Sequence, residues 1–399
     1  MTRRELLEAC VAGLMTRNLV AAADLPRDVR VTRAVGFRLA SRRSKIAGKN
    51  SRLDVHGDRA ADTMVRLTTN RGLEGIGNCR AKREDVAKLL GKDPFDFYRP
   101  SAPAMTGPLG AGTMPLWDLA GKILDKPAHR LLGGAGPRRV PVYDGSIYFA
   151  DLLPQYASRW QDRFREEIDM GLELGHRAFK IKIGRGAKWM ERAAGDARDV
   201  EVVHLVRRHA GPQILIGVDA NNGYDLPGAK RFLEQVGDDN LAFAEEMFPE
   251  VVEQCLEFKR FIQAHGWKTL LADGETQHRL EAFDPFIKAG AIDVFQGDMN
   301  HFGFEGILTE AARAHRRRLR VAPHNWGSLV GFYMQLHVGR AIPNFYRAEH
   351  DPLASDVLIA DGYAIKDGLA TVPDAPGFGL KLHEANFTRD TKITFDLEA

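Results

Sequence analysis

Nine residues in the second part of the sequence are of types that carry out acid–base and metal chemistry. They are Lys180, Lys182, Asp219, Asn221, Glu245, Glu275, Asp298, His324 and Glu349. If Asp219, Glu245 and Glu275 lie together, their carboxylates repel one another unless a hard divalent cation neutralises them. Magnesium suits such a cluster, because it prefers octahedral oxygen coordination and leaves positions open for a substrate carboxylate.

Basic side chains could flank that cation on two sides. Lys180 and Lys182 are two residues apart, so on a strand they point to the same face. On the other side, Asp298 can orient His324 as a carboxylate–imidazole dyad. Taken singly, a carboxylate after a strand is more often a helix N-cap than a ligand. A whole series of such residues on successive strands is hard to explain in that way.

These residues follow short β-branched runs that alternate with helical patterns from Arg138 onward. The eight runs are Val140–Tyr143, Phe179–Ile183, Ile214–Asp219, Leu241–Ala244, Thr269–Ala272, Ile292–Gln296, Leu319–Ala322 and Asn344–Ala348. This strict alternation predicts parallel strands with right-handed crossovers, closed into a β/α barrel whose strand ends share one rim. No amphipathic helix directly follows the last run. We therefore expect a modified TIM barrel of (β/α)7β type, in the α/β class.

The sequence before Arg138 has a different pattern. Val29–Ala40 and Ala61–Thr69 predict two or three antiparallel strands, and helices follow around Arg83–Leu90 and Met114–Leu132. We therefore expect an N-terminal α+β domain. The glycine- and proline-rich stretch 133–139 is typical of a boundary between this domain and the barrel.

Six short motifs follow one another in order along the predicted barrel. They are KIKIG (180–184), VDANNGY (218–224), AEE (244–246), ADGET (272–276), GD (297–298) and PHNWGS (323–328). Together they closely resemble the enolase superfamily, specifically the mandelate racemase subgroup of the mandelate racemase/muconate lactonizing family. Upstream, LWDLAGK (116–122) resembles the end of the N-terminal capping domain of that family. On this basis we expect an extension over 1–26, a capping domain over 27–135, the barrel over 136–350, and a segment over 351–399 that returns to the capping domain.

The resemblance implies a role for most of the nine residues. Three would bind one Mg²⁺ per subunit: Asp219, Glu245 and Glu275. Five would be catalytic: Lys182 and His324 as the acid/base pair, Asp298 as the residue that holds His324, Lys180 as a cation that neutralises the substrate carboxylate, and Glu349 as an acid that hydrogen-bonds one of its oxygens.

The chemistry implied is removal of a proton α to a carboxylate through an enediolate, as is established for enolase-superfamily enzymes generally. We expect a lyase, an acid-sugar dehydratase that converts a sugar acid into a 2-keto-3-deoxy acid, because a polar rim suits a hydroxylated substrate. Two alternatives remain open, namely a racemase or epimerase of a 2-hydroxy acid and a non-catalytic sugar-acid-binding barrel. A metal hydrolase is disfavoured, because its histidine-rich metal signature is absent.

Three further residues are candidate substrate contacts. Asn221 lies near the metal ligands. Arg185 could grip a second anionic or hydroxylated group, although a plain salt bridge is equally consistent with its position. Trp326 could form a wall of the pocket, although packing under the rim is more common for tryptophan. The basic stretch 42–49 lies between two predicted strands, and it could be either a lid over the mouth or a solvated loop.

Composition excludes several classes of partner. The 399 residues include 56 Lys+Arg and 53 Asp+Glu, a formal net charge of +3, so charge indicates no nucleic-acid partner. No apolar run approaches the roughly 20 residues of a membrane-spanning helix. Three cysteines without a CxxC pair fit a reducing compartment, so we expect a cytoplasmic homo-oligomer that acts on a small-molecule carboxylate. Arg3 and Arg4 suggest an export signal, but an amphipathic N-terminal helix fits better.

Overall fold

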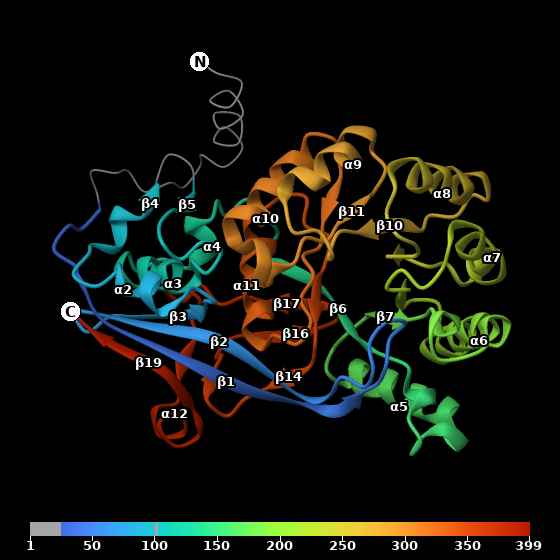
Figure 1. Cartoon of the computed structure of the whole chain (residues 1–399), viewed down its shortest axis with the longest axis horizontal. Helices are drawn as coiled ribbons and strands as arrows, with labels where there is room; N and C mark the ends of the chain where they lie inside the picture. Colours follow the sequence, from blue (N-terminus) through green and yellow to red (C-terminus); the bar gives the residue numbers. More distant parts are fainter. Residues whose placement is uncertain (1–24, 100–102) are drawn as a thin grey trace.

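The computed structural model describes residues 25–99 and 103–399. The N-terminal extension expected over 1–26 therefore lies almost wholly outside the described residues. Two parts of the described chain lie side by side, an antiparallel sheet with short helices and a β/α barrel (Figure 1). No described helix is long and apolar enough to cross a membrane.

The barrel has eight parallel strands and seven connecting helices. The strands are β6 (Arg139–Ile147), β7 (Ala178–Lys182), β8 (Leu215–Asp219), β9 (Phe243–Glu245), β10 (Leu270–Asp273), β11 (Val294–Phe295), β12 (Arg320–Val321) and β13 (Ala348–His350). The helices are α5 (Trp160–Glu173), α6 (Arg192–Ala210), α7 (Leu226–Val236), α8 (Val252–Ala264), α9 (Asp284–Ala289), α10 (Met299–His315) and α11 (Leu329–Ala341). Strand β13 pairs with β6, and a parallel bridge between Val321 and Phe345 closes the ring. The predicted (β/α)7β barrel is confirmed.

Local sequence accounts for these elements. Strand β7 is buried along its whole length, as expected for a parallel strand that helices cover on one face. Helix α7 begins at a good cap: the Asp225 side chain accepts a hydrogen bond from Gly228 N, and Pro227 occupies the first turn of α7. Helices α6, α10 and α11 also begin at a residue whose side chain caps the helix, whereas α5, α8 and α9 do not.

The capping domain is built on a three-stranded antiparallel meander. Its strands are β1 (Val31–Ala47), β2 (Gly57–Thr69) and β3 (Glu74–Asn78), a short hairpin is formed by β4 (Tyr98–Arg99) and β5 (Ala104–Met105), and its helices are α2 (Arg83–Ala87), α3 (Met114–Ile123) and α4 (Ala128–Leu131). The single helix expected around 114–132 is two helices, because the chain turns between them at Asp125, whose φ is 51°.

Strand β1 is longer than the apolar pattern predicted. It continues through Arg42, Arg43 and Lys45, and Arg42 still pairs with Arg59 of β2. Burial alternates along this end of the strand, but the buried positions carry polar side chains. Arg43 is buried against Asp351, and Lys45 is buried against Glu167. The basic stretch is therefore neither a solvated loop nor a free lid, because ion pairs attach it to the barrel.

The C-terminal residues return to both parts of the molecule. Their elements are β14 (Leu353–Ala354), β15 (Leu358–Ile359), β16 (Ala364–Lys366), β17 (Leu369–Thr371), β18 (Lys381–Leu382), α12 (Glu384–Asp390) and β19 (Lys392–Glu398). Strands β14 and β19 pair with β1, and β17 pairs with β6. Figure 1 shows β19 in red beside the blue β1, so the two ends of the described chain share one sheet.

Candidate active site

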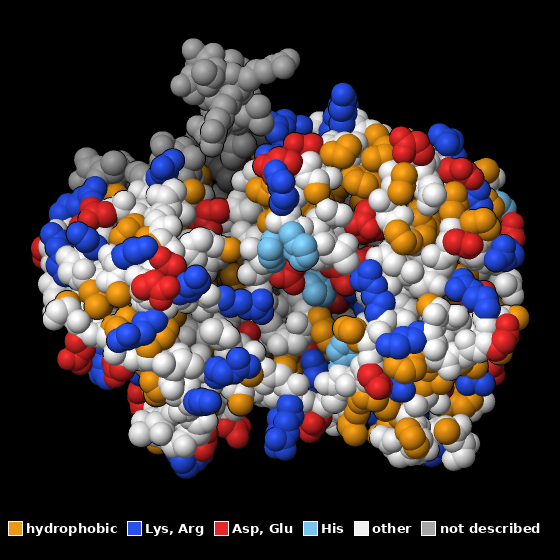
Figure 2. Space-filling view, viewed as in Figure 1, with side chains coloured by type: hydrophobic (Ala, Val, Ile, Leu, Met, Phe, Trp, Pro, Cys, Tyr) orange, Lys and Arg blue, Asp and Glu red, His pale blue; other side chains and the backbone are white. Residues whose placement is uncertain are grey.

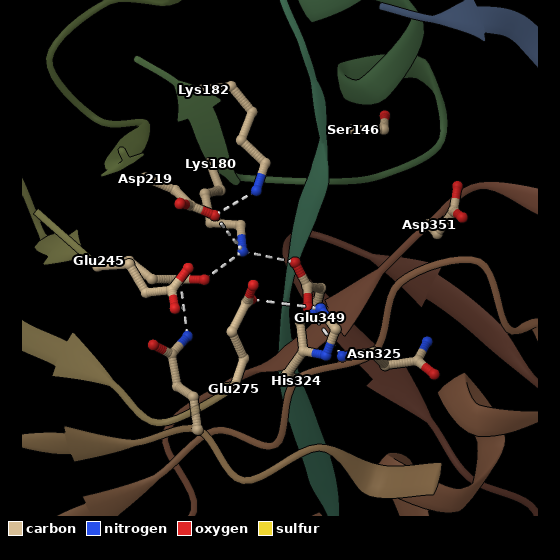
Figure 3. A network of polar contacts seen from close by, with 12 residues as sticks. Ser146, Lys180, Lys182, Asp219, Glu245, Glu275, His324, Asn325, Glu349 and Asp351 are labelled. Atoms are coloured by element: carbon tan, nitrogen blue, oxygen red, sulfur yellow. Dashed lines mark hydrogen bonds and ion pairs between the residues drawn. The ribbon is translucent and has the colours of Figure 1, made fainter. Parts of the chain in front are cut away.

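The polar residues singled out from the sequence meet at the carboxyl ends of the barrel strands. Figure 2 shows a hollow on this side of the molecule, with acidic and histidine side chains inside it. Lys180, Lys182, Asp219, Glu245 and Glu349 come from the strands themselves, whereas Glu275 and His324 follow β10 and β12 (Figure 3). Asp298 follows β11. The structure confirms the prediction that these side chains lie together at one rim of the barrel.

Asp219, Glu245 and Glu275 form the acid trio. Each offers a carboxylate oxygen, and the three oxygens lie within 4.8 Å of one another. Burial raises the pKa of Glu245 to about 8, despite the opposing effect of Lys180. Burial alone would also raise the pKa of Asp219, but Lys182 and Lys180 outweigh it and lower that pKa. Since one acid of the trio resists ionisation, the cluster has too little positive charge around it.

Lys180 lies at the centre of these acids. Its Nζ is 2.6 Å from Glu245 Oε1, 2.7 Å from Glu349 Oε1 and 3.0 Å from Asp219 Oδ2. Burial by itself would lower the pKa of Lys180, but the carboxylates of Glu245 and Glu349 raise it well above its usual value. Lys180 is therefore a fixed cation of the site.

Lys182 borders the trio on one side (Figure 3). Its Nζ donates to Asp219 Oδ2 at 2.5 Å and to Asn221 Oδ1 at 2.8 Å. Asn221 in turn donates from Nδ2 to Glu275 Oε1 at 3.3 Å. Its φ is 42°, a left-handed conformation that asparagine adopts more readily than most residues. Asn221 thus connects Lys182 with the far end of the trio.

His324 borders the trio on the opposite side (Figure 3). Its Nδ1 lies 2.7 Å from Asp298 Oδ2, and its Nε2 lies 3.3 Å from Glu275 Oε2. Asp298 is also the N-cap of α10, since its Oδ1 accepts from His301 N at 2.7 Å. Burial would lower the pKa of His324, but Glu275 and Asp298 raise it to about 10. In this form of the site His324 is an imidazolium, which is a proton donor.

Glu349 is held between the two sides. Its Oε1 contacts Lys180, and its Oε2 accepts from Asn325 N at 2.8 Å. Burial would raise the pKa of Glu349, but Lys180 and His324 lower it. The side chain is therefore a carboxylate here. Its expected role as an acid stays a prediction, because it requires proton uptake when a substrate carboxylate arrives.

The barrel is also the part of the chain that matches a family of known proteins. A family model described as enolase C-terminal domain-like, of the mandelate racemase/muconate lactonizing type, matches residues 163–386, which is more than half of the chain. The chain belongs to the enolase superfamily, in its mandelate racemase/muconate lactonizing family. The resemblance inferred from the six motifs is thus confirmed.

Individual superfamily members match over nearly the whole chain. The D-galactarolactone cycloisomerase of Agrobacterium fabrum is 28% identical over 366 residues, which covers 83% of this chain and 91% of that enzyme. A Geobacillus galacturonate dehydratase, solved with D-galacturonate and 5-keto-4-deoxy-D-galacturonate, is 29% identical with a TM-score of 0.83, covering 92% of this chain and 100% of that one. A Geobacillus mandelate racemase/muconate lactonizing protein, solved with magnesium and tartrate, is 30% identical with a TM-score of 0.85, covering 93% and 97%.

The acid trio of this superfamily member fits Mg²⁺. All three donors are carboxylates, the ligand type that this hard cation prefers. Glu275 Oε2 is at ion-pair distance from His324 but makes no hydrogen bond within the described residues. A buried acceptor without a donor, in a cluster short of positive charge, is what a cation ligand requires. Asp219, Glu245 and Glu275 would therefore hold the ion.

Arg185 is not part of the site, which corrects the expectation that it binds substrate. Its guanidinium lies 2.8 Å from Asp151 Oδ1 and 2.5 Å from Asp199 Oδ1, with no exposed surface. It also lies over the Phe149 ring at 4.2 Å. Its donors are occupied, so the plain salt bridge is the correct alternative. The sequence did not reveal this, because the two acids are 34 and 14 residues away.

The role of Trp326 as a wall of the pocket stays a prediction, and its contacts are with residues that the sequence analysis missed. Its ring stacks on Tyr148 with centroids 4.5 Å apart, and its Nε1 donates to His56 Nδ1 at 3.1 Å. Arg43 lies 4.5 Å above the same ring. No signal in the sequence marked His56 or Tyr148, because neither belongs to one of the six motifs.

Two missed residues lie beside the trio itself. Gln296 Nε2 donates to Glu245 Oε2 at 2.7 Å, and Glu246 Oε2 accepts from Asn221 Nδ2 at 3.0 Å. Glu246 is the second glutamate of the AEE motif, and Gln296 ends a predicted strand immediately before the GD motif. These neighbouring positions were signals that could have identified both residues.

Proposed function

We propose that this protein is a magnesium-dependent acid-sugar dehydratase, a hydro-lyase that converts a sugar acid into a 2-keto-3-deoxy acid. One observation carries the proposal. A lysine amine group and an imidazole flank the acid trio from opposite sides, Lys182 at Asp219 and His324 at Glu275. A protein that only binds a sugar acid needs no such pair. An enzyme that removes one proton from the substrate and donates another to it needs both residues. The likeness to a galacturonate dehydratase supports the same class of reaction.

Positive charge must stabilise the substrate as its α proton leaves. Mg²⁺ held by Asp219, Glu245 and Glu275 supplies charge to the carboxylate oxygens. Lys180 adds a fixed ammonium from the floor of the site, where it already contacts three carboxylates. Electrostatic stabilisation of this kind is usually the largest contribution to catalysis.

The two flanking residues move the protons. Lys182 Nζ, as the free amine, accepts the α proton, and the electrons of the broken C–H bond form the enediolate. His324 then donates its Nε2 proton to the β-hydroxyl, the C–O bond breaks and water leaves. The enol that remains takes up a proton at the former β carbon and loses its hydroxyl proton, which gives the 2-keto-3-deoxy acid. Positioned acid/base catalysis of this kind contributes roughly 10² to 10⁴ in rate.

A cycloisomerase is the second candidate, because the chain is also similar to a galactarolactone cycloisomerase. That reaction and racemisation begin with the same proton abstraction and differ in the fate of the enediolate. A racemase or epimerase would return a proton to the opposite face of the α carbon. A non-catalytic sugar-acid-binding barrel would leave the α proton in place.

The test is a panel of aldonic, aldaric and uronic acids and aldarolactones, each incubated with the enzyme and Mg²⁺ in D₂O. Formation of 2-keto acid, together with deuterium incorporation, supports the dehydratase. Deuterium at the α carbon with inverted configuration and no keto acid indicates the racemase. Consumption of a lactone without loss of water indicates the cycloisomerase, and absence of exchange with every compound indicates the binding barrel.

We also propose that the enzyme works in the cytoplasm as a homo-oligomer. Two cysteines among the described residues, Cys79 and Cys255, are free and buried, which suits a reducing compartment. Light scattering of the purified protein gives the subunit number. Fractionation of the cells that make it, followed by detection with an antibody, gives its location.

A further inference from the structure

Glu246 directly follows Glu245 of the acid trio but does not belong to the trio itself. Its side chain is fully buried. Its φ is 41°, in the left-handed region, where a glutamate is uncommon. Asn221 and Asn222, which follow the neighbouring strand β8, have φ values of 42° and 61°. Three residues close to the trio therefore share a conformation that is typical of functional sites when it occurs outside glycine.

Hydrogen bonds join these three residues to one another. Asn222 N donates to Glu246 O at 2.6 Å. The Glu246 carboxyl accepts from both amides, at Oε2 from Asn221 Nδ2 at 3.0 Å and at Oε1 from Asn222 Nδ2 at 3.3 Å. The other end of the Asn221 amide contacts Lys182. The conformation of Glu246 thus places its carboxyl at the end of the Asn221 amide that is opposite to Lys182.

The end of the Asn221 amide that is turned to Lys182 matters for the reaction. Lys182 Nζ donates to Asn221 Oδ1 at 2.8 Å and to Asp219 Oδ2 at 2.5 Å (Figure 3). An ammonium has only donors, so it selects the oxygen end of the amide. The free amine that removes the α proton has two N–H groups and a lone pair. When Asp219 and Asn221 accept from the two N–H groups, the lone pair is left for the α proton.

A reversed amide would block the base. Asn221 Nδ2 would then donate to the lone pair of the amine, which could no longer accept a proton from the substrate. The amine does not prevent this reversal, because an uncharged amine can both donate and accept. An acceptor at the far end of the amide is therefore required, and Glu246 Oε2 is one. Glu275 Oε1 is a second, longer acceptor at 3.3 Å, but Glu275 is one of the residues that would hold Mg²⁺.

We propose that Glu246 is a positioning residue for the proton abstraction, because it holds the Asn221 amide with its oxygen toward Lys182. This inference rests on the proposed function for the role of Lys182 as the base. Glu246 needs no contact with the substrate or with the metal ion. It acts only through Asn221, and this dependence can be measured.

The first experiment measures turnover of the sugar acid of the panel that has the highest kcat/KM. Glu246→Met keeps the length of the side chain but removes the acceptor, and it should lower kcat by about tenfold to a hundredfold. KM should stay nearly unchanged, because the contact serves the reacting state and not substrate binding. With substrate deuterated at the α carbon, the isotope effect on kcat should be at least as large as in the unmodified enzyme. Glu253→Met, the same change at an exposed glutamate of α8, is the matched control.

Two further variants test whether Glu246 acts through Asn221. Glu246→Gln keeps an acceptor for Asn221 Nδ2, and its own amide can donate to Asn222 Oδ1 once that amide turns over. Asn222 Oδ1 has no hydrogen-bond partner in the described part of the chain. This variant should keep kcat within about fivefold of the unmodified enzyme. Asn221→Gly suits the left-handed backbone and removes the amide. In that background Glu246→Met should cause little further loss, because the group that it positions is already absent.

Three results would overturn the proposal. An unchanged kcat in Glu246→Met would mean that Asn221 needs no acceptor there. The same fold loss with and without the Asn221 side chain would mean that Glu246 acts by another route. A rate that saturating Mg²⁺ restores would mean that Glu246 only supports the acid trio. If Glu246→Met does not fold, Glu246→Asp replaces it with the same expected loss, because the shorter side chain withdraws the acceptor.

A second experiment does not depend on turnover. In protein labelled with ¹⁵N-asparagine and saturated with Mg²⁺, the NH₂ signals of Asn221 are those missing from Asn221→Gly. Their exchange with solvent should be up to about tenfold faster in Glu246→Met and nearly unchanged in Glu246→Gln. Equal exchange in Glu246→Met and the unmodified protein overturns the proposal. Failure of the dehydratase proposal is seen separately, as absence of keto acid from the unmodified enzyme.

Discussion

The floor and the roof of the active site use basic residues in opposite ways. On the floor, Lys180 and Lys182 contact the carboxylates that bind the cation and lie where a substrate would react. The roof consists of the end of β1 and the loop that follows it, residues 42–56. There Arg43 and Lys45 are buried in ion pairs with Asp351 and Glu167, which attach the capping domain to the barrel. The charged residues of the floor thus take part in the reaction, whereas those of the roof attach the capping domain to the barrel.

This difference follows from the architecture. Parallel strand ends meet at one rim, so any residue placed there joins the same cluster. The roof belongs to the capping domain. Specific contacts with the barrel must therefore hold it in position before it can affect which substrate binds. We therefore expect changes in the floor to abolish the reaction, and changes in the roof to alter stability and selectivity while the chemistry remains.

The largest effect should come from removing a floor base. Lys182→Ala and His324→Asn should each lower the rate by at least 10² to 10⁴, roughly the contribution of positioned acid/base catalysis. Formation of the 2-keto acid measures the loss in both variants, and exchange of the α proton in D₂O, followed by NMR, measures the step that Lys182 serves. Lys268→Ala, an exposed lysine away from the rim, is the control. If both variants form keto acid at the rate of the unmodified enzyme, the floor is not the catalytic region.

The next largest effect should come from the attachment of the roof. Arg43→Met leaves the fully buried Asp351 carboxylate without its partner and should lower the free energy of unfolding by about 3–5 kcal/mol. Urea denaturation measures this change, and the neighbouring exposed Arg42→Met is the matched control. Mg²⁺ affinity at the floor should stay the same. A loss of Mg²⁺ affinity as large as the loss of stability would show that the two regions are not separate.

The floor should also bind its cation in a pH-dependent way. The pKa of Glu245 is raised to about 8 without the ion, and a ligand carboxyl must lose its proton before it binds. Apparent Mg²⁺ affinity should therefore rise with pH up to about 8, by at most about tenfold per unit, and then level off. Calorimetric titration at several pH values measures it. Glu245→Gln should weaken binding and flatten the profile, and a flat profile in the unmodified protein would contradict this account.

The smallest effect concerns Glu310, a buried carboxyl that makes no ion pair within the described part of the chain. Burial raises the pKa of Glu310 to about 8, and its Oε1 accepts from Gly297 N at 3.4 Å, next to Asp298. A folded-state pKa above the unfolded value means that its contribution to stability is complete below about 4.5 and is lost as pH rises through 8. Glu310→Gln mimics the neutral acid, so it should remove up to about 1.4 kcal/mol per pH unit of this dependence. Thermal unfolding between pH 5 and 9 tests it, and an unchanged slope would show that Glu310 is already ionised.

The barrel and its floor could be predicted because their signals are local. Each strand is a short apolar run, and each functional residue lies at or just beyond the end of one, as Asp219 and Glu245 show. The same reasoning failed for the end of β1. Its buried positions carry Arg43 and Lys45, which look exposed in sequence because their partners are far away. Arg185 was misassigned for the same reason.

The sequence by itself therefore determined the class of fold, the acid trio and the two residues that flank it, since period and spacing place strand ends without knowledge of tertiary contacts. Only the tertiary structure decided which charges are available. Arg185 is held in ion pairs by Asp151 and Asp199, whereas Lys182 lies beside the acid trio. The physical reason is that availability depends on which partner lies within hydrogen-bond distance, and folding sets that distance between residues remote in the chain.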